Sequence, residues 1–120
     1  NLPISEELTA YGYYVADSAK YHVPNFLAAG ATAIMCGNDL IASGVITECK
    51  KRGYSVPEDI SVIGFDDLPI SAHLTPPLTT IKQDQMRLAQ ELWKQVTAYR
   101  TGKRVKNIML EQELVVRGSC

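Results

Sequence analysis

The amino-acid sequence predicts an α/β fold with a parallel sheet flanked by helices, and three features lead to this prediction. The apolar run over residues 32–36 (TAIMC) stops at a glycine, which is typical of a strand buried on both faces. An amphipathic helical pattern follows over residues 39–53 and ends in basic residues and Gly53. A second β-branched run covers residues 60–64 (ISVIG). Because strand, helix and strand alternate, we expect parallel strands joined by a right-handed crossover.

The segment before this unit predicts a short strand over residues 13–15 and a helix over residues 17–29. Pro24 falls inside the helical stretch, where it lacks a backbone N–H and its ring clashes with the preceding turn. The helix must therefore either bend at Pro24 or begin late.

Three further elements follow the second strand. Residues 78–82 (LTTIK) are expected to form a brief extended segment, and the spacing of apolar residues over 84–100 predicts an amphipathic helix that needs a partner surface. Alternating apolar residues over 108–116 predict a last strand with one face more buried. Because an open α/β sheet usually needs about five strands, we expect a segment before Asn1 to supply the others.

Composition and charge indicate an ordinary globular chain. Of its 120 residues, 46% are hydrophobic and 21% are charged, and the formal net charge is -1. The chain as a whole therefore offers no general electrostatic attraction for nucleic acid or for an anionic membrane. The basic cluster of Lys103, Arg104 and Lys106 could contact phosphate, but a solvated loop explains it better.

The cytoplasm is the location expected from the sequence. No apolar stretch approaches the roughly 18 residues of a membrane span, and residues 1–8 lack the charged start and apolar core of a secretory signal. The cysteines Cys36, Cys49 and Cys120 have neither a paired nor a zinc-binding spacing, which favours a reducing compartment.

We predict no catalytic residue, no metal site and no cofactor. No serine lies in a nucleophile elbow, and the small-residue stretch at 29–32 precedes a strand instead of following one, the wrong order for a phosphate loop. A metal site built from three aspartates and a histidine is conceivable, but the histidine lies among prolines without a second one nearby. The residues concerned are Asp39, Asp66, Asp67 and His73.

Polar side chains follow both predicted strands, Asn38 after the first and Asp66 after the second. The carboxyl ends of parallel strands meet at one edge, where open α/β sheets bind ligands, so an amide and a carboxylate there could grip the hydroxyls of a polyol such as a sugar. Asp39 is better explained as the cap of the following helix, and Asp66 with Asp67 could simply form turns. From the residues alone, both interpretations of Asn38 and Asp66 stay open.

Three strings of the sequence together resemble one protein family. They are residues 32–39 (TAIMCGND), 53–67 (GYSVPEDISVIGFDD) and 76–84 (PPLTTIKQD), which occur in this order in the C-terminal half of LacI/GalR transcription regulators. The chain is thereby identified as part of the periplasmic-binding-protein-like (type I) sensor of that family. The resemblance implies a small-molecule effector, a sugar or a related polar metabolite, and contact with DNA only through a helix-turn-helix outside this chain.

The resemblance also implies how the chain divides. Residues 1–81 and 107–120 would belong to the C-terminal lobe of the sensor, and residues 82–106 would form a crossover helix that packs on the N-terminal lobe. The family's cleft arginine would lie before Asn1, so the isolated chain should bind an effector weakly. Gln85 stands where some members carry an aromatic ring, which leaves the identity of the effector open.

Carried over residue by residue, the resemblance assigns four effector contacts. Asp66 in the GFDD string matches the position that hydrogen-bonds sugar hydroxyls, and Asn38 in the GND string matches a second polar contact. Gln83 in the IKQD string would line the cleft at the crossover. Tyr14 is similar to an aromatic residue that stacks on the ligand, although a packed surface tyrosine explains it equally well.

The family resemblance implies a homodimer as well. An effector that bridges the two lobes favours one hinge angle, and this changes the spacing of two DNA-reading heads. The dimer surface would include the helix after the ND pair and the loop after the DD pair. The apolar residues of these segments are Leu40, Val45, Ile46, Leu68, Ile70 and Leu74.

Two other functions stay open at this point. A sugar-binding protein of a transport system shares the architecture, but it would lack the LTTIKQD string and would be made with a leader peptide. A small α/β enzyme that uses Asp66 as an acid or a base is the third possibility, and its turnover would be abolished by Asp66→Asn.

Overall fold

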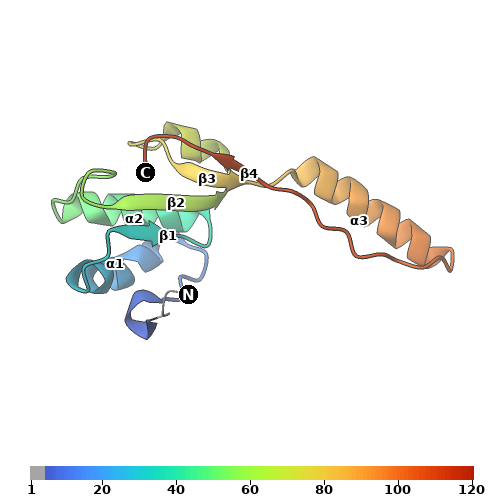
Figure 1. The fold of residues 1–120 in the computed structure, drawn as a ribbon, viewed down its shortest axis with the longest axis horizontal. Helices are drawn as coiled ribbons and strands as arrows, with labels where there is room; N and C mark the ends of the chain where they lie inside the picture. Colours follow the sequence, from blue (N-terminus) through green and yellow to red (C-terminus); the bar gives the residue numbers. More distant parts are fainter. Residues whose placement is uncertain (1–4) are drawn as a thin grey trace.

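The computed structural model describes residues 5–120, which build a four-stranded sheet in the order β1, β2, β3, β4 (Figure 1). β1 (Ala33–Met35), β2 (Ser61–Asp66) and β3 (Thr79–Lys82) run parallel to one another, and β4 (Glu113–Val115) runs antiparallel to β3. The predicted α/β class and the parallel pairing of the first two strands are confirmed.

Helix α2 (Asp39–Lys51) links β1 to β2 and packs on one face of the sheet, here called the inner face. It begins after Asn38, whose side-chain Oδ1 accepts a hydrogen bond from the Ile41 N–H at 2.8 Å. The prediction that Asp39 caps this helix is therefore wrong. Asn38 has the extended backbone of a cap residue, whereas Asp39 is already the first helical residue.

Two short 3-10 helices and one α-helix precede β1. They are η1 (Glu6–Leu8), η2 (Ala16–Ser18) and α1 (Ala19–Ala28). The helix predicted over residues 17–29 thus starts in the 3-10 form and becomes α-helical only at Ala19, and it keeps Pro24 inside. The α-helix begins five residues before Pro24, so its start is not late enough to place the proline in the first turn, where a missing N–H would cost nothing.

Residues 13–15 form a turn instead of the predicted strand. Tyr13 and Tyr14 have φ angles of 47° and 57°, in the left-handed region that no β-strand uses. The turn is closed by a hydrogen bond of 3.3 Å from the Val15 N–H to the Gly12 carbonyl. Its consequence is to direct the chain into η2, which lies against α2.

The hydrophobic core lies between the inner face of the sheet and helices α1 and α2. Ile34 and Val62 reach it from β1 and β2, and Leu78 reaches it from the start of β3. The core residues are Ala19, Val23, Ile34, Cys36, Ala42, Val45, Ile46, Cys49, Ile60, Val62 and Leu78. Burial of this apolar surface on one side of the sheet is the main favourable term in folding.

The other face of β1 is open to solvent. Ile34 is buried, but Ala33 and Met35 on either side of it are exposed, Met35 to 81%. The prediction that residues 32–36 are buried on both faces is therefore wrong for the chain as described. The reason is that α1 and α2 pack against each other and contribute to a single core on the inner side of the sheet.

Helix α3 (Gln85–Arg100) extends away from the sheet, and none of its residues is buried (Figure 1). Asp84 caps it, because the Asp84 Oδ1 accepts a hydrogen bond from the Arg87 N–H at 2.9 Å. The predicted amphipathic helix is confirmed, and within residues 5–120 its apolar stripe faces solvent. The large exposed residues of this stripe are Leu88, Leu92, Trp93, Val96 and Tyr99.

After α3 the chain returns alongside the helix toward the sheet (Figure 1). The strand predicted over residues 108–116 is only three residues long, β4, and Leu114 within it is 53% exposed. The physical reason is the length of its partner. β3 ends at Lys82, which pairs with Glu113, so residues before Glu113 have no strand to pair with.

Gly44→Ala should lower the free energy of unfolding by about 1–3 kcal/mol, the usual cost of overpacking. A Cβ at Gly44 would overlap the backbone carbonyl of Ala16 in η2. The direction of the change identifies the close packing, because replacing glycine by alanine in a helix interior otherwise stabilises the helix by about 1 kcal/mol. Urea unfolding measures the effect. Gly37→Ala is the control, since a Cβ there meets nothing within 4 Å, and equal stabilities of the two variants would contradict this packing.

Candidate functional site

The carboxyl ends of β1 and β2 lie at one edge of the sheet, here called the polar edge. Met35 pairs with Ile63 in a parallel register, so Asn38 and Asp66 each lie three residues beyond a paired position. The two side chains expected to share an edge are thus delivered to the same end of adjacent parallel strands. This is the place where open α/β sheets bind their ligands.

Asn38 is buried, and its side chain already has two partners. Its Oδ1 caps α2 through the Ile41 N–H, and its Nδ2 lies 3.5 Å from the carbonyl oxygen of Tyr14. The amide therefore has a structural role in ordering the start of the helix and the turn before η2. A donor proton and an acceptor lone pair remain for any further contact.

The Tyr14 side chain projects from the left-handed turn and is 71% exposed. Its backbone contact with Asn38 places the turn next to the polar edge. Tyr11 and Tyr13 are also exposed. The ring of Tyr14 is thus not packed into the core, which is the arrangement that a stacking contact requires.

Asp66 ends β2 and contacts Gln83, which follows β3. The Gln83 Nε2 donates a hydrogen bond to the Asp66 Oδ1 at 2.6 Å. Asp66 has a φ of 113°, outside the range of ordinary strand residues, so its side chain leaves the line of the strand. Within residues 5–120 the second carboxylate oxygen, Oδ2, has no hydrogen-bond partner. The structure thus brings together two of the residues predicted to contact an effector.

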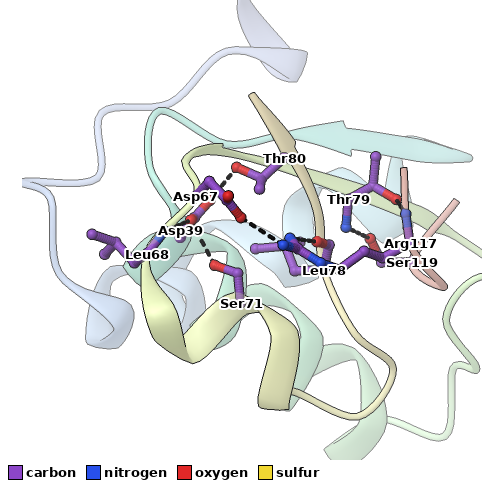
Figure 2. Close-up of polar contacts among 9 residues, drawn as sticks. All are labelled: Asp39, Asp67, Leu68, Ser71, Leu78, Thr79, Thr80, Arg117 and Ser119. Atoms are coloured by element: carbon purple, nitrogen blue, oxygen red, sulfur yellow. Dashed lines mark hydrogen bonds and ion pairs between the residues drawn. The ribbon is translucent and has the colours of Figure 1, made fainter. Parts of the chain in front are cut away.

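Asp39 has a role that the sequence did not predict. Its side chain is fully buried, and its Oδ2 accepts hydrogen bonds from the Leu68 N–H at 2.7 Å and the Ser71 hydroxyl at 2.6 Å (Figure 2). Its Oδ1 accepts one from the Thr80 hydroxyl at 2.5 Å. Gly64 is required beside it, because a Cβ there would overlap the Asp39 carboxylate. Asp39 is thus an internal anchor of the polar edge.

A second anchor comes from the far end of the chain. The Arg117 Nη2 forms an ion pair with the Asp67 Oδ1 at 2.7 Å, and the Arg117 Nη1 donates to the Leu78 carbonyl at 2.8 Å (Figure 2). Sequence reasoning considered Asp67 only as a turn or metal-site residue and did not single out Arg117. The one signal for Arg117 was a basic residue directly after an apolar run.

The segment after β2 contains the 3-10 helix η3 (Pro69–His73). His73 is exposed at its end, and Asp39 and Asp67 are committed to the contacts described above. No group of three metal-ligating side chains is found among residues 5–120. In the same described range, none of the helices combines the length and the apolarity needed to cross a membrane.

The six residues predicted to form a dimer surface divide into two groups. Val45 and Ile46 are 3% and 5% exposed and belong to the core, so the prediction is wrong for these two. They lie on the side of α2 that faces the sheet, which a helical stripe alone could not distinguish from an external contact. Leu40 and Ile70 are exposed. Leu68 and Leu74 are half-buried.

A hollow of about 570 Å³ lies beside β1 and reaches the polar edge at Gly37, directly before Asn38. It is bounded by β1, by α1 and by the segment before η2, and its lining is mostly apolar. None of the residues predicted to contact an effector lines it.

Comparison with known proteins gives a consistent result. The model of the periplasmic binding protein-like domain matches residues 4–120. The HTH-type transcriptional repressor PurR of Vibrio campbellii is 33% identical over 99% of this chain and 37% of the repressor. The HTH-type transcriptional repressor CytR of Escherichia coli K12 is 36% identical over 73% of this chain and 26% of the repressor.

Solved structures show the same relationship. The transcription regulator CcpA of Lactococcus lactis superposes with a TM-score of 0.89 at 26% identity, over 98% of this chain and 44% of the regulator. The lac repressor dimer bound to operator superposes with a TM-score of 0.81 at 35% identity, over 88% of this chain and 38% of the repressor. The chain thus spans less than half the length of each of these relatives.

Asp39→Asn should lower the free energy of unfolding by about 3 kcal/mol, because a buried acceptor of three hydrogen bonds loses part of its acceptor capacity. Urea unfolding followed by circular dichroism measures the effect. The matched control is Asp17→Asn, which breaks an exposed pair with Lys20 and should leave the unfolding midpoint unchanged. Equal midpoints for the two variants would remove Asp39 as an anchor.

Cys36 should resist alkylation in the folded protein. Burial raises the pKa of the Cys36 thiol to about 12, so at pH 8 almost none of it is the reactive thiolate. Cys120 is exposed and should react with iodoacetamide at least about a hundredfold faster. Mass spectrometry of the alkylated peptides measures both rates. Comparable rates in buffer would contradict the packing of Cys36, whereas comparable rates in denaturant are expected.

Proposed function

The chain belongs to the periplasmic binding protein-like domain family. On this premise we propose that it is the C-terminal part of the sensor of a LacI/GalR-type transcription regulator and that it binds a small-molecule effector at the polar edge. The effector is a sugar or a related polar metabolite. DNA is contacted by a helix-turn-helix outside this chain, and the regulator acts in the cytoplasm.

One observation carries the proposal. The Asp66 carboxylate leaves the end of a parallel strand in a left-handed conformation, is oriented by Gln83 and keeps one oxygen unpaired within the described residues. A carboxylate accepts hydrogen bonds from two hydroxyl groups, which suits a polyol. Asn38 supplies the remaining amide donor, and Tyr14 supplies an exposed ring for stacking on the apolar face of a sugar. One structural relative is named as a complex with cellobiose.

The exposed apolar stripe of α3 supports the proposed division of the chain. Residues 1–81 and 107–120 form one lobe of the sensor, and residues 82–106 cross to a second lobe whose surface covers the stripe. The course of the chain agrees with this division, since it leaves the sheet after β3 and returns to it at β4. The effector then binds between the lobes and favours one hinge angle.

The regulator acts as a homodimer in this proposal. The segments after the two polar-edge strands, α2 and η3, carry Leu40 and Ile70 on their exposed surfaces, with Leu68 and Leu74 beside them. Three structural relatives are described as lac repressor dimers, one of them bound to operator. Because the same segments start at the polar edge, an effector there can change the dimer geometry and hence DNA binding.

The two alternative functions receive less support. A transport sugar-binding protein would share the fold, but the curated relatives are HTH-type transcriptional regulators. These relatives are regulators and not enzymes, which fits a sensor rather than a catalyst.

Asp66→Ala should weaken effector binding at least tenfold, or about 1.4 kcal/mol. A thermal-shift screen of monosaccharides, cellobiose, sugar phosphates and purines on the intact regulator identifies the effector class, and calorimetry then compares the variant with the wild type. The control is Glu58→Ala, an exposed carboxylate before the opposite end of β2. Unchanged affinity of the Asp66 variant would remove this residue from the site, and turnover of any compound would favour an enzyme.

A further inference from the structure

We propose that Arg117 is a positioning residue, which acts with Asp39 to hold the Asp66–Asp67 turn left-handed and so sets where the Asp66 carboxylate points. This inference rests on the proposed function, because it concerns the residue assigned to the effector. It adds the last segment of the chain to the determinants of that site.

The turn needs external support because both of its residues have unfavourable backbone conformations. Asp66 and Asp67 have φ angles of 113° and 54°, and neither is a glycine. Non-glycine residues hold such conformations only where the surrounding structure determines them. The contacts of the turn show what determines this one.

The first support follows the turn directly. The Leu68 N–H donates to the Asp39 Oδ2 at 2.7 Å, and the Asp39 carboxylate is itself held by the hydroxyls of Ser71 and Thr80 (Figure 2). Asp39 is fully buried, so this acceptor cannot exchange its partners for water without opening the structure. The backbone leaving the turn is thereby fixed.

The second support is an ion pair with the side chain of Asp67. Arg117 and Asp67 form an ion pair of 2.7 Å in which the two side chains are 19% and 16% exposed. The other end of the guanidinium donates to the Leu78 carbonyl at 2.8 Å, and the Arg117 N–H donates to the Thr79 hydroxyl at 2.9 Å. A planar guanidinium that spans the turn and the start of β3 defines their separation.

The position of Arg117 is itself fixed by the sheet. Two residues later, the hydroxyl of the buried Ser119 donates a hydrogen bond to the Val62 carbonyl. The same Ser119 Oγ accepts a hydrogen bond from the Thr79 N–H at 2.8 Å. The Ser119 carbonyl accepts from the Val62 N–H at 2.8 Å. Arg117 therefore projects from a segment that is hydrogen-bonded to both β2 and β3. The position of its guanidinium, and hence of the Asp67 side chain, is set by these two strands.

The Asp66 carboxylate depends on this grip through its backbone. Its Oδ1 accepts a hydrogen bond from the Gln83 Nε2 at 2.6 Å, and the backbone turns at Asp66, the last residue of β2, where φ is 113°. Without the ion pair at Asp67, the turn can relax toward extended torsions, and the carboxylate then leaves Gln83. Loss of the Arg117 side chain should thus displace the Asp66 carboxylate, although Arg117 does not contact Asp66 itself.

The test compares Arg117→Ala and wild type in the intact regulator by hydrogen–deuterium exchange with mass spectrometry. Peptides covering residues 65–74 should exchange at least tenfold faster in the variant, whereas peptides from α2 should not change. Crystals of the variant should show the Gln83 Nε2 and the Asp66 Oδ1 beyond hydrogen-bonding distance. Arg117→Lys, which retains the charge but not the fork, should give an intermediate exchange rate. Neither measurement requires an effector. The role of Arg117 can therefore be tested even if the screen for a sugar effector fails.

The matched control is Arg52→Ala, which removes an arginine–carboxylate pair with Glu48 on α2 and should not affect residues 65–74. Asp67→Asn should reproduce the effect of Arg117→Ala, and the double variant should exchange no faster than either single one. Exchange of residues 65–74 within twofold of wild type would overturn the proposal. An equal acceleration in α2 would also overturn it, because Arg117 would then support the whole fold. If Arg117→Ala does not fold, Arg117→Lys and Asp67→Asn decide by the same criteria.

Discussion

The buried carboxylate of Asp39 is the interaction on which the polar edge depends. A charge removed from water is tolerated only when hydrogen bonds replace its hydration, and the donors here come from the residue after the turn, from η3 and from β3. Its position in the first turn of α2 adds the favourable field of a helix N-terminus. The start of one helix, a loop and a central strand therefore share one acceptor, and none of them can move independently.

This arrangement separates the residues that build the edge from those that are free to bind. Asn38 is committed to the helix cap, and Asp39 and Asp67 are committed to anchoring the loop after β2. Within the described residues, Asp66 and Asp67 each keep one carboxylate oxygen without a hydrogen-bond partner, but Asp67 is held in an ion pair with Arg117 whereas Asp66 contacts only the neutral Gln83 amide. In this cluster of acidic and amide residues, we propose Asp66 as the main effector contact and the neighbouring residues as its supports.

The open surfaces of the chain agree with the proposed place of the chain in a two-lobed sensor. The core occupies one side of the sheet, while Met35 on the other side and the apolar stripe of α3 face solvent. Apolar surface of this extent is expected where another part of a protein packs. In the proposed arrangement, the stripe of α3 is covered by the second lobe, which also completes the effector site opposite Asp66.

Local pattern was enough to predict the α/β class, the parallel β1–α2–β2 unit and the helix after β3, because periodicity and β-branched runs are properties of neighbouring residues. The polar edge followed from those elements, since parallel strands must end together. Tertiary contacts decided three other features. They are the choice of Asn38 as the cap of α2, the left-handed turns at Tyr14 and Asp66, and the short length of β4. The Arg117–Asp67 pair joins residues 50 positions apart, and no local pattern records a contact that only the folded sheet creates.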